Sequence, residues 1–238
     1  MTPVPAQLRQ SALDHYEEMA RLGQAFGSPV RLRLLDLLRQ APRSVDALSE
    51  EAGLPVANVS QHLRQLRAAH VVSSERQGQR VIYRLSGPMV ASFFLAFRTF
   101  GEMLLPELDR LKKDIQSAER GLAPDEFRQL LDRGKALVVD VRPNEEYHHA
   151  HFDDAVSIPL EELPSRLHEL PRSKVVVPTC RGPYCPLAIQ AVSLLREAGF
   201  EAAHFDLDEF SEGIGVETPM VPRSAPTKKA AARKKRSS

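Results

Sequence analysis

The sequence predicts two domains of different fold class, an N-terminal domain that is mostly helical and a C-terminal α/β domain with a mostly parallel sheet. Helical periodicity dominates the first part of the 238-residue chain, whereas helical and strand-like stretches alternate in the second. Charge divides the chain at the same place. Residues 1–120 carry 16 Lys and Arg against 13 Asp and Glu, and residues 121–220 carry 9 against 18. We therefore expect domains at 11–110 and 122–220, with a linker at 111–121.

The remaining residues, 221–238, contain seven Lys and Arg and no acidic residue, so we expect a disordered basic tail. Such a tail attracts nucleic acid weakly, or it only keeps the chain soluble. The apolar-rich stretch 89–97 is far shorter than the roughly 20 residues that span a bilayer. Residues 1–10 lack the apolar segment of an export signal, and the two cysteines form no disulfide framework. Together these features indicate the cytoplasm and no membrane.

Four helices are expected in the first 70 residues. They span residues 11–26, 30–39, 44–53 and 55–69. Ser28 and Ser44 are placed as N-caps, with Pro29 at a first helical position and Gly53 as a helix end. The third and fourth helices, joined by a turn of about four residues, form a helix-turn-helix.

The fourth helix predicts a surface that reads DNA. Val59, Leu63 and Leu66 fall on one stripe and are expected to pack inward. The other side carries amide, hydroxyl and guanidinium groups, which read base edges in a major groove. The candidate DNA-binding residues here are Asn58, Ser60, Gln61, His62, Arg64 and Gln65. On this helix alone, an ordinary solvated face explains the same residues equally well.

Residues 71–85 favour DNA binding. Two strand-like runs flank Gln77-Gly78, which predicts a hairpin with Arg76 and Arg80 near its tip. A basic hairpin after a helix-turn-helix is a wing, and its arginines neutralise phosphates and set the register on the duplex. The N-terminal domain is therefore predicted to be a winged helix-turn-helix that binds double-stranded DNA.

This domain resembles the ArsR family of winged-helix transcriptional regulators. The matching stretches are residues 27–35, 60–66 and 83–85. The resemblance implies a homodimer that binds a near-palindromic operator and releases it on receiving a signal. It implies no metal site, because residues 44–48 read Ser-Val-Asp-Ala-Leu where the family's metal sensors carry a Cys-x-Cys pair. His70 stands where the family usually has a glycine, and His62 is expected to pack against a helix or contact the DNA backbone.

Residues 88–111 are expected to form one helix that is apolar nearly all round, with four phenylalanines. Such a helix must be buried on more than one side. We expect a dimer interface, and a core within a single chain is the alternative.

The second half alternates helices and strands. Helices are expected at 124–131, 144–149, 160–170 and 186–198, and strands at 136–141, 155–158, 175–177 and 202–205. In a parallel sheet, reactive groups lie beyond the carboxyl ends of the strands. Both cysteines, Cys180 and Cys185, lie in a loop that follows a strand and precedes a helix. Backbone N–H groups and the helix N-terminus favour the nucleophilic thiolate there, although two packed core cysteines are the alternative.

This half also resembles a single rhodanese domain. The matching residues are 140–142, 145–152, 155–160 and 180–182. The resemblance implies that Cys180 takes up a sulfane sulfur as a persulfide, and that a structural histidine stands at His151. The candidate catalytic residues are therefore Cys180, Cys185, Arg181, Gly182, Arg142 and Asp140.

The loop departs from thiosulfate-type rhodaneses, because Cys185 stands where an arginine commonly holds the anionic donor. A second thiol instead can attack a persulfide or sulfenate on Cys180 and leave a disulfide or a sulfur-bridged pair. Pro186 stands where a phosphatase or arsenate reductase needs an arginine, which argues against those activities. The cluster of His148, His149 and His151 with Glu145 and Glu146 matches no metal-ligand spacing, so we expect neither a metal nor another cofactor.

Three functional hypotheses follow. The first is a dimeric transcriptional regulator whose rhodanese-like domain senses sulfane sulfur or redox state, or transfers sulfur, in a way coupled to operator binding. The second is a sulfurtransferase, using thiosulfate or polysulfide through a Cys180 persulfide, in which the winged helix only localises or dimerises the enzyme. The third leaves residues 11–110 as a dimerisation module without DNA binding.

Overall fold

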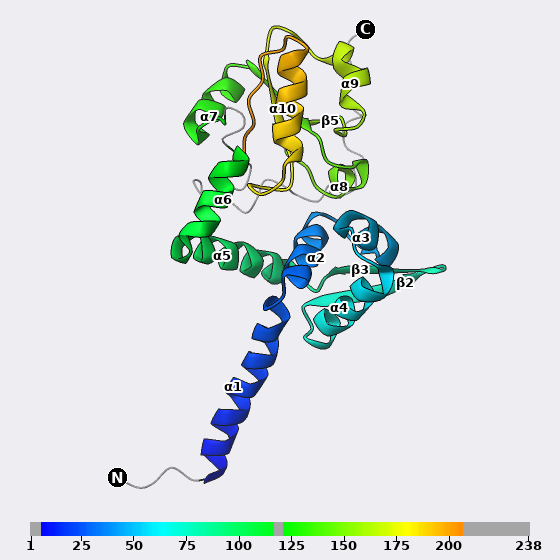
Figure 1. Cartoon of the computed structure of the whole chain (residues 1–238), viewed down its shortest axis with the longest axis vertical. Coiled ribbons are helices and arrows are strands. Elements are labelled where there is room, and N and C mark those ends of the chain that lie inside the picture. Colours follow the sequence, from blue (N-terminus) through cyan, green and yellow to red (C-terminus); the bar gives the residue numbers. More distant parts are fainter. Residues whose placement is uncertain (1–5, 117–120, 207–238) are drawn as a thin grey trace, which may run out of the picture. The chain divides into compact units, whose positions relative to one another are not determined.

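The computed structural model describes residues 6–116 and 121–206, which fold as two compact units that divide between Leu104 and Leu105 (Figure 1). The expected basic tail lies outside the described residues. The first unit comprises α1 (Ala6–Phe26), α2 (Pro29–Gln40), β1 (Arg43–Ser44), α3 (Val45–Ala52), α4 (Val56–Ala68), β2 (Val72–Gln77), β3 (Arg80–Leu85) and α5 (Pro88–Leu104). These elements confirm the predicted winged helix-turn-helix.

Side-chain caps begin two helices of the first unit, α2 and α3. The Ser28 hydroxyl accepts a hydrogen bond from the Arg31 backbone, and Ser44 does the same for Ala47, so both predicted N-caps are confirmed. Gly53 ends α3 with a φ of 64°, a left-handed conformation that favours glycine. His70 adopts the same conformation with a φ of 57°, at the position where the resemblance leads one to expect glycine.

The core of this unit lies among α2, α3 and α4. Leu34, Leu35 and Leu48 are completely buried, as are the three inward residues predicted for α4. The strands form an antiparallel sheet in the order β1-β3-β2, and the two-residue β1 was not expected. The β2–β3 hairpin extends beyond the helices as a wing (Figure 1).

The expectation of one helix over 88–111 is wrong. The first helix, α5, ends at Leu104, and a second, α6 (Pro106–Gln116), begins after one intervening residue, Leu105. Pro106 explains the break, because proline has no N–H to donate and its ring excludes a helical conformation from the residue before it. Within the described part of the chain, no single helix is both long and apolar enough to span a membrane. The pair α5 and α6 meets that test only when it is counted together across its bend.

The second unit is the predicted α/β domain. After α6 it comprises α7 (Pro124–Asp132), β4 (Ala136–Asp140), α8 (Asn144–His149), β5 (Val156–Ser157), α9 (Leu163–Arg166), a 3₁₀ turn (Leu167–Glu169), β6 (Val175–Thr179) and α10 (Leu187–Glu197). The strands are parallel in the order β5-β4-β6. The predicted helix over 160–170 is therefore shorter than expected and ends as a 3₁₀ turn.

Side chains alternate along each strand, so they project from both faces of the sheet, and both faces are buried. Val139 and Val176 pack on one side with Val192 of α10, whereas Val138 and Val177 pack on the other with the aromatic residues of a second cluster. Phe127 of α7 stacks on Phe205 in that second cluster, with ring centroids 4.1 Å apart. The loop after β6 thus begins from a strand that is fixed on both faces.

The expected strand over 202–205 is present only as an extended segment. It makes single parallel bridges, Ala202 to Val176 and His204 to Gly121, rather than a continuous ladder. The Ala203 N–H donates to the Val176 carbonyl, and the Leu122 N–H donates to the His204 carbonyl. These bonds fix His204 beside the carboxyl end of the sheet.

Candidate functional site

The loop between β6 and α10 brings both thiols to one place at the carboxyl end of the sheet. Cys180 and Cys185 are free and half-buried. The Cys185 N–H donates to the Gly182 carbonyl, which closes the loop. Gly182 has a φ of 126°, a backbone conformation that residues other than glycine rarely adopt. The Cys180 thiol lies 3.4 Å from the Cys185 carbonyl oxygen.

The interaction between the two thiols shifts their pKa values in opposite directions. Donation from Cys180 lowers the pKa of Cys185 to about 7, and backbone hydrogen bonds at Arg181 and Leu187 lower it further against the effect of burial. The same bond, together with burial, raises the pKa of Cys180 well above its usual value. The opposite directions of the two pKa shifts favour the thiolate on Cys185 over the thiolate on Cys180.

A buried ionic network lies beside the loop. Arg142 donates to both oxygens of Asp140, at 2.9 and 2.6 Å, and to the Ala150 carbonyl at 2.8 Å. Arg181 donates to Glu146 of α8, with its shortest contact at 2.7 Å. Glu146 also lies 3.8 Å from Arg142, so two guanidinium groups and two carboxylates form one balanced set. The structure therefore places Asp140, Arg142 and Arg181 in this network.

The network determines which polar groups of the loop face a ligand. The Arg181 side chain is directed to Glu146, whose own side chain is completely buried. Arg181 is the only arginine between Thr179 and Pro186. The loop therefore presents backbone N–H groups and a second thiol to a bound ligand, with its guanidinium already bound to a carboxylate. Sequence reasoning missed the role of Glu146, although its spacing of four residues from Arg142 on a helical stretch was a usable signal.

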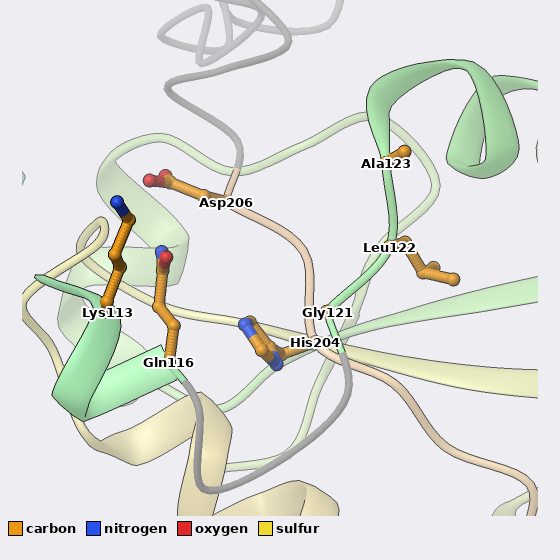
Figure 2. A pocket seen from close by; sticks show the side chains of 7 residues that line it. All are labelled: Lys113, Gln116, Gly121, Leu122, Ala123, His204 and Asp206. Carbon is orange, nitrogen blue, oxygen red and sulfur yellow. The ribbon is translucent and has the colours of Figure 1, made fainter.

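A cavity of about 390 Å³ adjoins the loop (Figure 2). Its lining residues are Lys113, Gln116, Gly121, Leu122, Ala123, His204 and Asp206. A smaller space contains both cysteines and shares Gln116, His204 and Asp206 with the first. None of these three shared residues was singled out from the sequence, because α6 and the segment after α10 meet only in the folded unit.

The candidate DNA-binding surface comprises α4 and the wing. Gln61, Arg64 and Gln65 are exposed on α4, whereas Asn58, Ser60 and His62 are half-buried. The Gln65 side chain accepts a hydrogen bond from Arg31 at 2.7 Å, which orients it from α2. Arg76 and Arg80 are exposed near the tip of the hairpin, where Gln77 pairs with Arg80 around the turn.

Comparison with known proteins agrees with both halves of this description. A helix-turn-helix domain model matches residues 26–75, and a rhodanese-like domain model matches residues 123–213. The HTH-type transcriptional regulator Rv0324 of Mycobacterium tuberculosis is 35% identical over 199 residues, which cover 83% of this chain and 87% of that protein. The chain belongs to the ArsR-type transcriptional regulators and carries a C-terminal rhodanese-like domain.

Solved structures resemble each half separately. The homodimeric winged helix-turn-helix domain of Mb0332 from Mycobacterium bovis, described as a possible ArsR-family regulator, is 31% identical and has a TM-score of 0.39. It covers 44% of this chain and 94% of that one. A rhodanese-related protein from Thermoplasma volcanium is 20% identical with a TM-score of 0.35, covering 40% of this regulator and 93% of its own chain.

The histidine cluster of this ArsR-type regulator is explained by local packing. His151 stacks on Tyr147, with ring centroids 3.9 Å apart, and hydrogen-bonds the Tyr147 carbonyl. His148 contacts the carbonyl of Asn144 through one ring nitrogen. Within residues 6–116 and 121–206, no three His, Cys, Asp or Glu side chains are grouped to hold a metal ion.

The thiol pair predicts reciprocal effects of single substitutions. Alkylation by iodoacetamide requires the thiolate, so its rate in the wild-type protein should rise with pH around a midpoint of about 7. Cys180→Ala removes the donor to Cys185 and should move that midpoint upward. Cys185→Ala removes the main cause of the raised Cys180 pKa and should bring that pKa down. Equal midpoints in all three proteins, measured by mass spectrometry, would contradict the shared proton.

The ionic network predicts a large stability effect from one substitution. Glu146→Gln leaves the two guanidinium groups of Arg142 and Arg181 with a single carboxylate, so it should destabilise the second unit by about 3 kcal/mol. Hydrogen exchange in β4 and β6 measures this locally. Glu145→Gln, at the exposed neighbouring position, is the matched control and should change exchange little. Similar exchange in the two variants would show that the network contributes little.

Proposed function

We propose that this regulator binds operator DNA as a homodimer, and that the Cys180–Cys185 pair receives a sulfane-sulfur or redox signal that changes operator affinity. The observation that carries the proposal is the placement of both thiols in one short loop, with the Cys180 Sγ 3.4 Å from the Cys185 carbonyl oxygen. We assign DNA binding and dimerisation to residues 11–110 and sulfur chemistry to residues 122–220. The regulator would act in the cytoplasm, where thiols stay reduced.

The pair can accept sulfur in steps that need no external oxidant beyond the donor itself. A thiolate of the pair attacks the outer sulfur of a persulfide donor, the donor's S–S bond breaks, and the departing thiolate takes up a proton. The protein then holds a persulfide. Attack by the second thiolate on the inner sulfur of that persulfide forms a disulfide and expels hydrosulfide. A modified thiol pair differs in size and charge from the reduced pair.

The arginine arrangement supports sensing over rapid turnover of thiosulfate. A dianionic donor needs a cationic clamp, and Arg181 is directed to Glu146. The lowered pKa of Cys185 and the rhodanese-like match support sulfurtransferase activity as the second candidate function. Steady-state assays with thiosulfate, 3-mercaptopyruvate and polysulfide separate the two. Sensing predicts a single stoichiometric loading, whereas multiple turnovers at modest donor concentration favour the enzyme.

The homodimer is supported by apolar side chains that remain exposed within one chain. On α5, Met89 and Met103 are 78% and 79% exposed, and Phe100 is 59% exposed. On α1, Tyr16 and Met19 are 67% and 56% exposed. Helix α1 extends away from the rest of its unit (Figure 1). Side chains of this kind are normally covered, and a second copy of both helices would cover them. The Mb0332 domain is itself described as homodimeric.

Sensing requires coupling between sulfur loading and DNA affinity. Loading changes operator affinity only if its free energy differs between the DNA-bound and free conformations. An operator is first selected from random duplexes, and the Kd is then measured by fluorescence anisotropy with reduced and polysulfide-treated protein. We expect a change of about fivefold or more in the wild type.

The thiol variants test the role of the pair. Cys180→Ser and Cys185→Ser should bind the operator as reduced wild type does, and polysulfide should no longer change their Kd. If both variants bind and release the operator like wild type in polysulfide, the sensing proposal fails.

The DNA surface predicts two different mutational signatures. Arg80→Ala should reduce the slope of log K against log salt by about 0.9, since one phosphate contact is lost. Arg64→Ala should cost about 1–3 kcal/mol and relax the base preference. Arg133→Ala, an exposed arginine of the second unit, is the control and should change neither. Absence of specific, salt-dependent binding would leave residues 11–110 as a dimerisation module.

A further inference from the structure

We propose that Arg31 is a positioning residue for DNA reading: it orients the Gln65 amide so that Gln65 selects guanine in the operator. The inference rests on the proposed DNA-binding surface of α4. It goes further because it names the base that Gln65 selects and the side chain that imposes the choice.

Three hydrogen bonds fix the Arg31 guanidinium near the start of α2. Its Nε donates to the Ala25 carbonyl at 2.8 Å, and its Nη2 donates to the Gln24 carbonyl at 2.5 Å. Its Nη1 donates to the Gln65 Oε1 at 2.7 Å. Because the guanidinium is planar and its N–H groups form a rigid fork, the two bonds to the backbone determine the direction of the third.

The end of α1 holds the two backbone acceptors. Gln24 and Ala25 lie in the last turn of α1, where carbonyl groups have no partner within the helix and the helix dipole favours a cation. Phe26, the last residue of α1, is 7% exposed and packs edge-on against Phe93 of α5, with ring centroids 4.8 Å apart. The acceptors that orient Arg31 are therefore anchored to the core of the first unit.

The bond to Arg31 determines which end of the Gln65 amide is turned outward. A guanidinium only donates hydrogen bonds, so the amide oxygen faces Arg31 and the NH₂ group points away from it. Gln65 is exposed, and the exposed Gln61, four residues earlier, lies on the same face of α4. The candidate DNA-reading face of α4 therefore presents a fixed hydrogen-bond donor at Gln65.

A fixed donor distinguishes between base pairs in the major groove. Guanine presents two acceptors there, N7 and O6, whereas adenine presents one acceptor and an amino donor. Glutamine binds adenine by using its oxygen and its nitrogen together, and here Arg31 engages the oxygen. The positive charge of Arg31 also polarises the amide and strengthens its NH₂ group as a donor. The arrangement therefore favours guanine over adenine at the base pair that Gln65 contacts.

Base preference separates this role from a purely structural one. Arg31 also caps α1, and a loss of stability weakens binding to all duplexes alike, whereas a loss of positioning changes the ratio between them. The full-length protein is titrated with duplexes that carry each of the four base pairs at each operator position, and ratios of Kd values are compared. In the wild type we expect guanine to be preferred to adenine by about fivefold at one position, and Gln65→Ala should abolish that ratio.

Arg31→Lys tests the positioning directly. It keeps the positive charge but not the planar fork, so it should bring the same ratio close to one and leave the ratios at other positions unchanged. In the double variant with Gln65→Ala, Arg31→Lys should have no further effect on that ratio, because the side chain through which it acts is absent.

Gln65→Glu tests the direction of the donor. The carboxylate still accepts from Arg31 but has no N–H group to donate, so the preference should move from guanine to cytosine, whose N4 amino group is a donor. The replaced side chain is exposed, so this variant should fold as the wild type does.

Arg33→Lys is the matched control. Arg33 is an exposed arginine of the same helix that donates to the Glu51 carbonyl, and its replacement should change no ratio. Unchanged ratios in Arg31→Lys, or adenine preferred to guanine at the position that Gln65→Ala affects, overturn the positioning role alone. A wild-type protein without base preference at any position overturns the proposed reading of DNA by α4 as well.

Discussion

The chemistry of the second unit depends on the bond between Arg181 and Glu146. It connects the thiol loop to α8 and, through the contact of Glu146 with Arg142, to the end of β4. Asp140, Arg142 and Glu146 are buried, and Arg181 is half-buried. Because the four charges balance, removing one of them leaves another without its partner. The bond also removes the loop's only arginine from the ligand. What remains at the site is a pair of thiols and a set of backbone N–H groups.

The two units are joined between consecutive helices. Helix α6 carries Lys113 and Gln116 of the cavity, and it follows α5, the apolar helix whose side chains are exposed within one chain. Only Leu105 separates the two helices. The proposed coupling of sulfur loading to operator binding needs two conformations with different free energies on and off DNA.

Local patterns predicted most of the fold. Caps at Ser28 and Ser44, the stripe on α4 and the alternation of apolar residues in β4 and β6 all depend on near neighbours, and all were read correctly. The helix over 88–111 was predicted as continuous because its hydrophobicity outweighed Pro106. In the site, the two cysteines were found because they are chemically distinctive. Glu146 and His204 were missed as functional groups, since their roles arise from contacts between distant segments. The charge distribution within the thiol pair was equally beyond the sequence, because it depends on which thiol donates.

Reciprocal linkage between sulfur loading and operator binding tests the central claim most directly. If loading changes operator affinity by some factor, operator DNA must change the loading equilibrium by the same factor. The measurement titrates the full-length protein with a persulfide–thiol redox buffer, with and without saturating operator, and reads the loaded fraction by intact mass spectrometry. A shift in the loading midpoint that equals the ratio of the two operator Kd values agrees with the account. Identical loading curves for free and DNA-bound protein would contradict it.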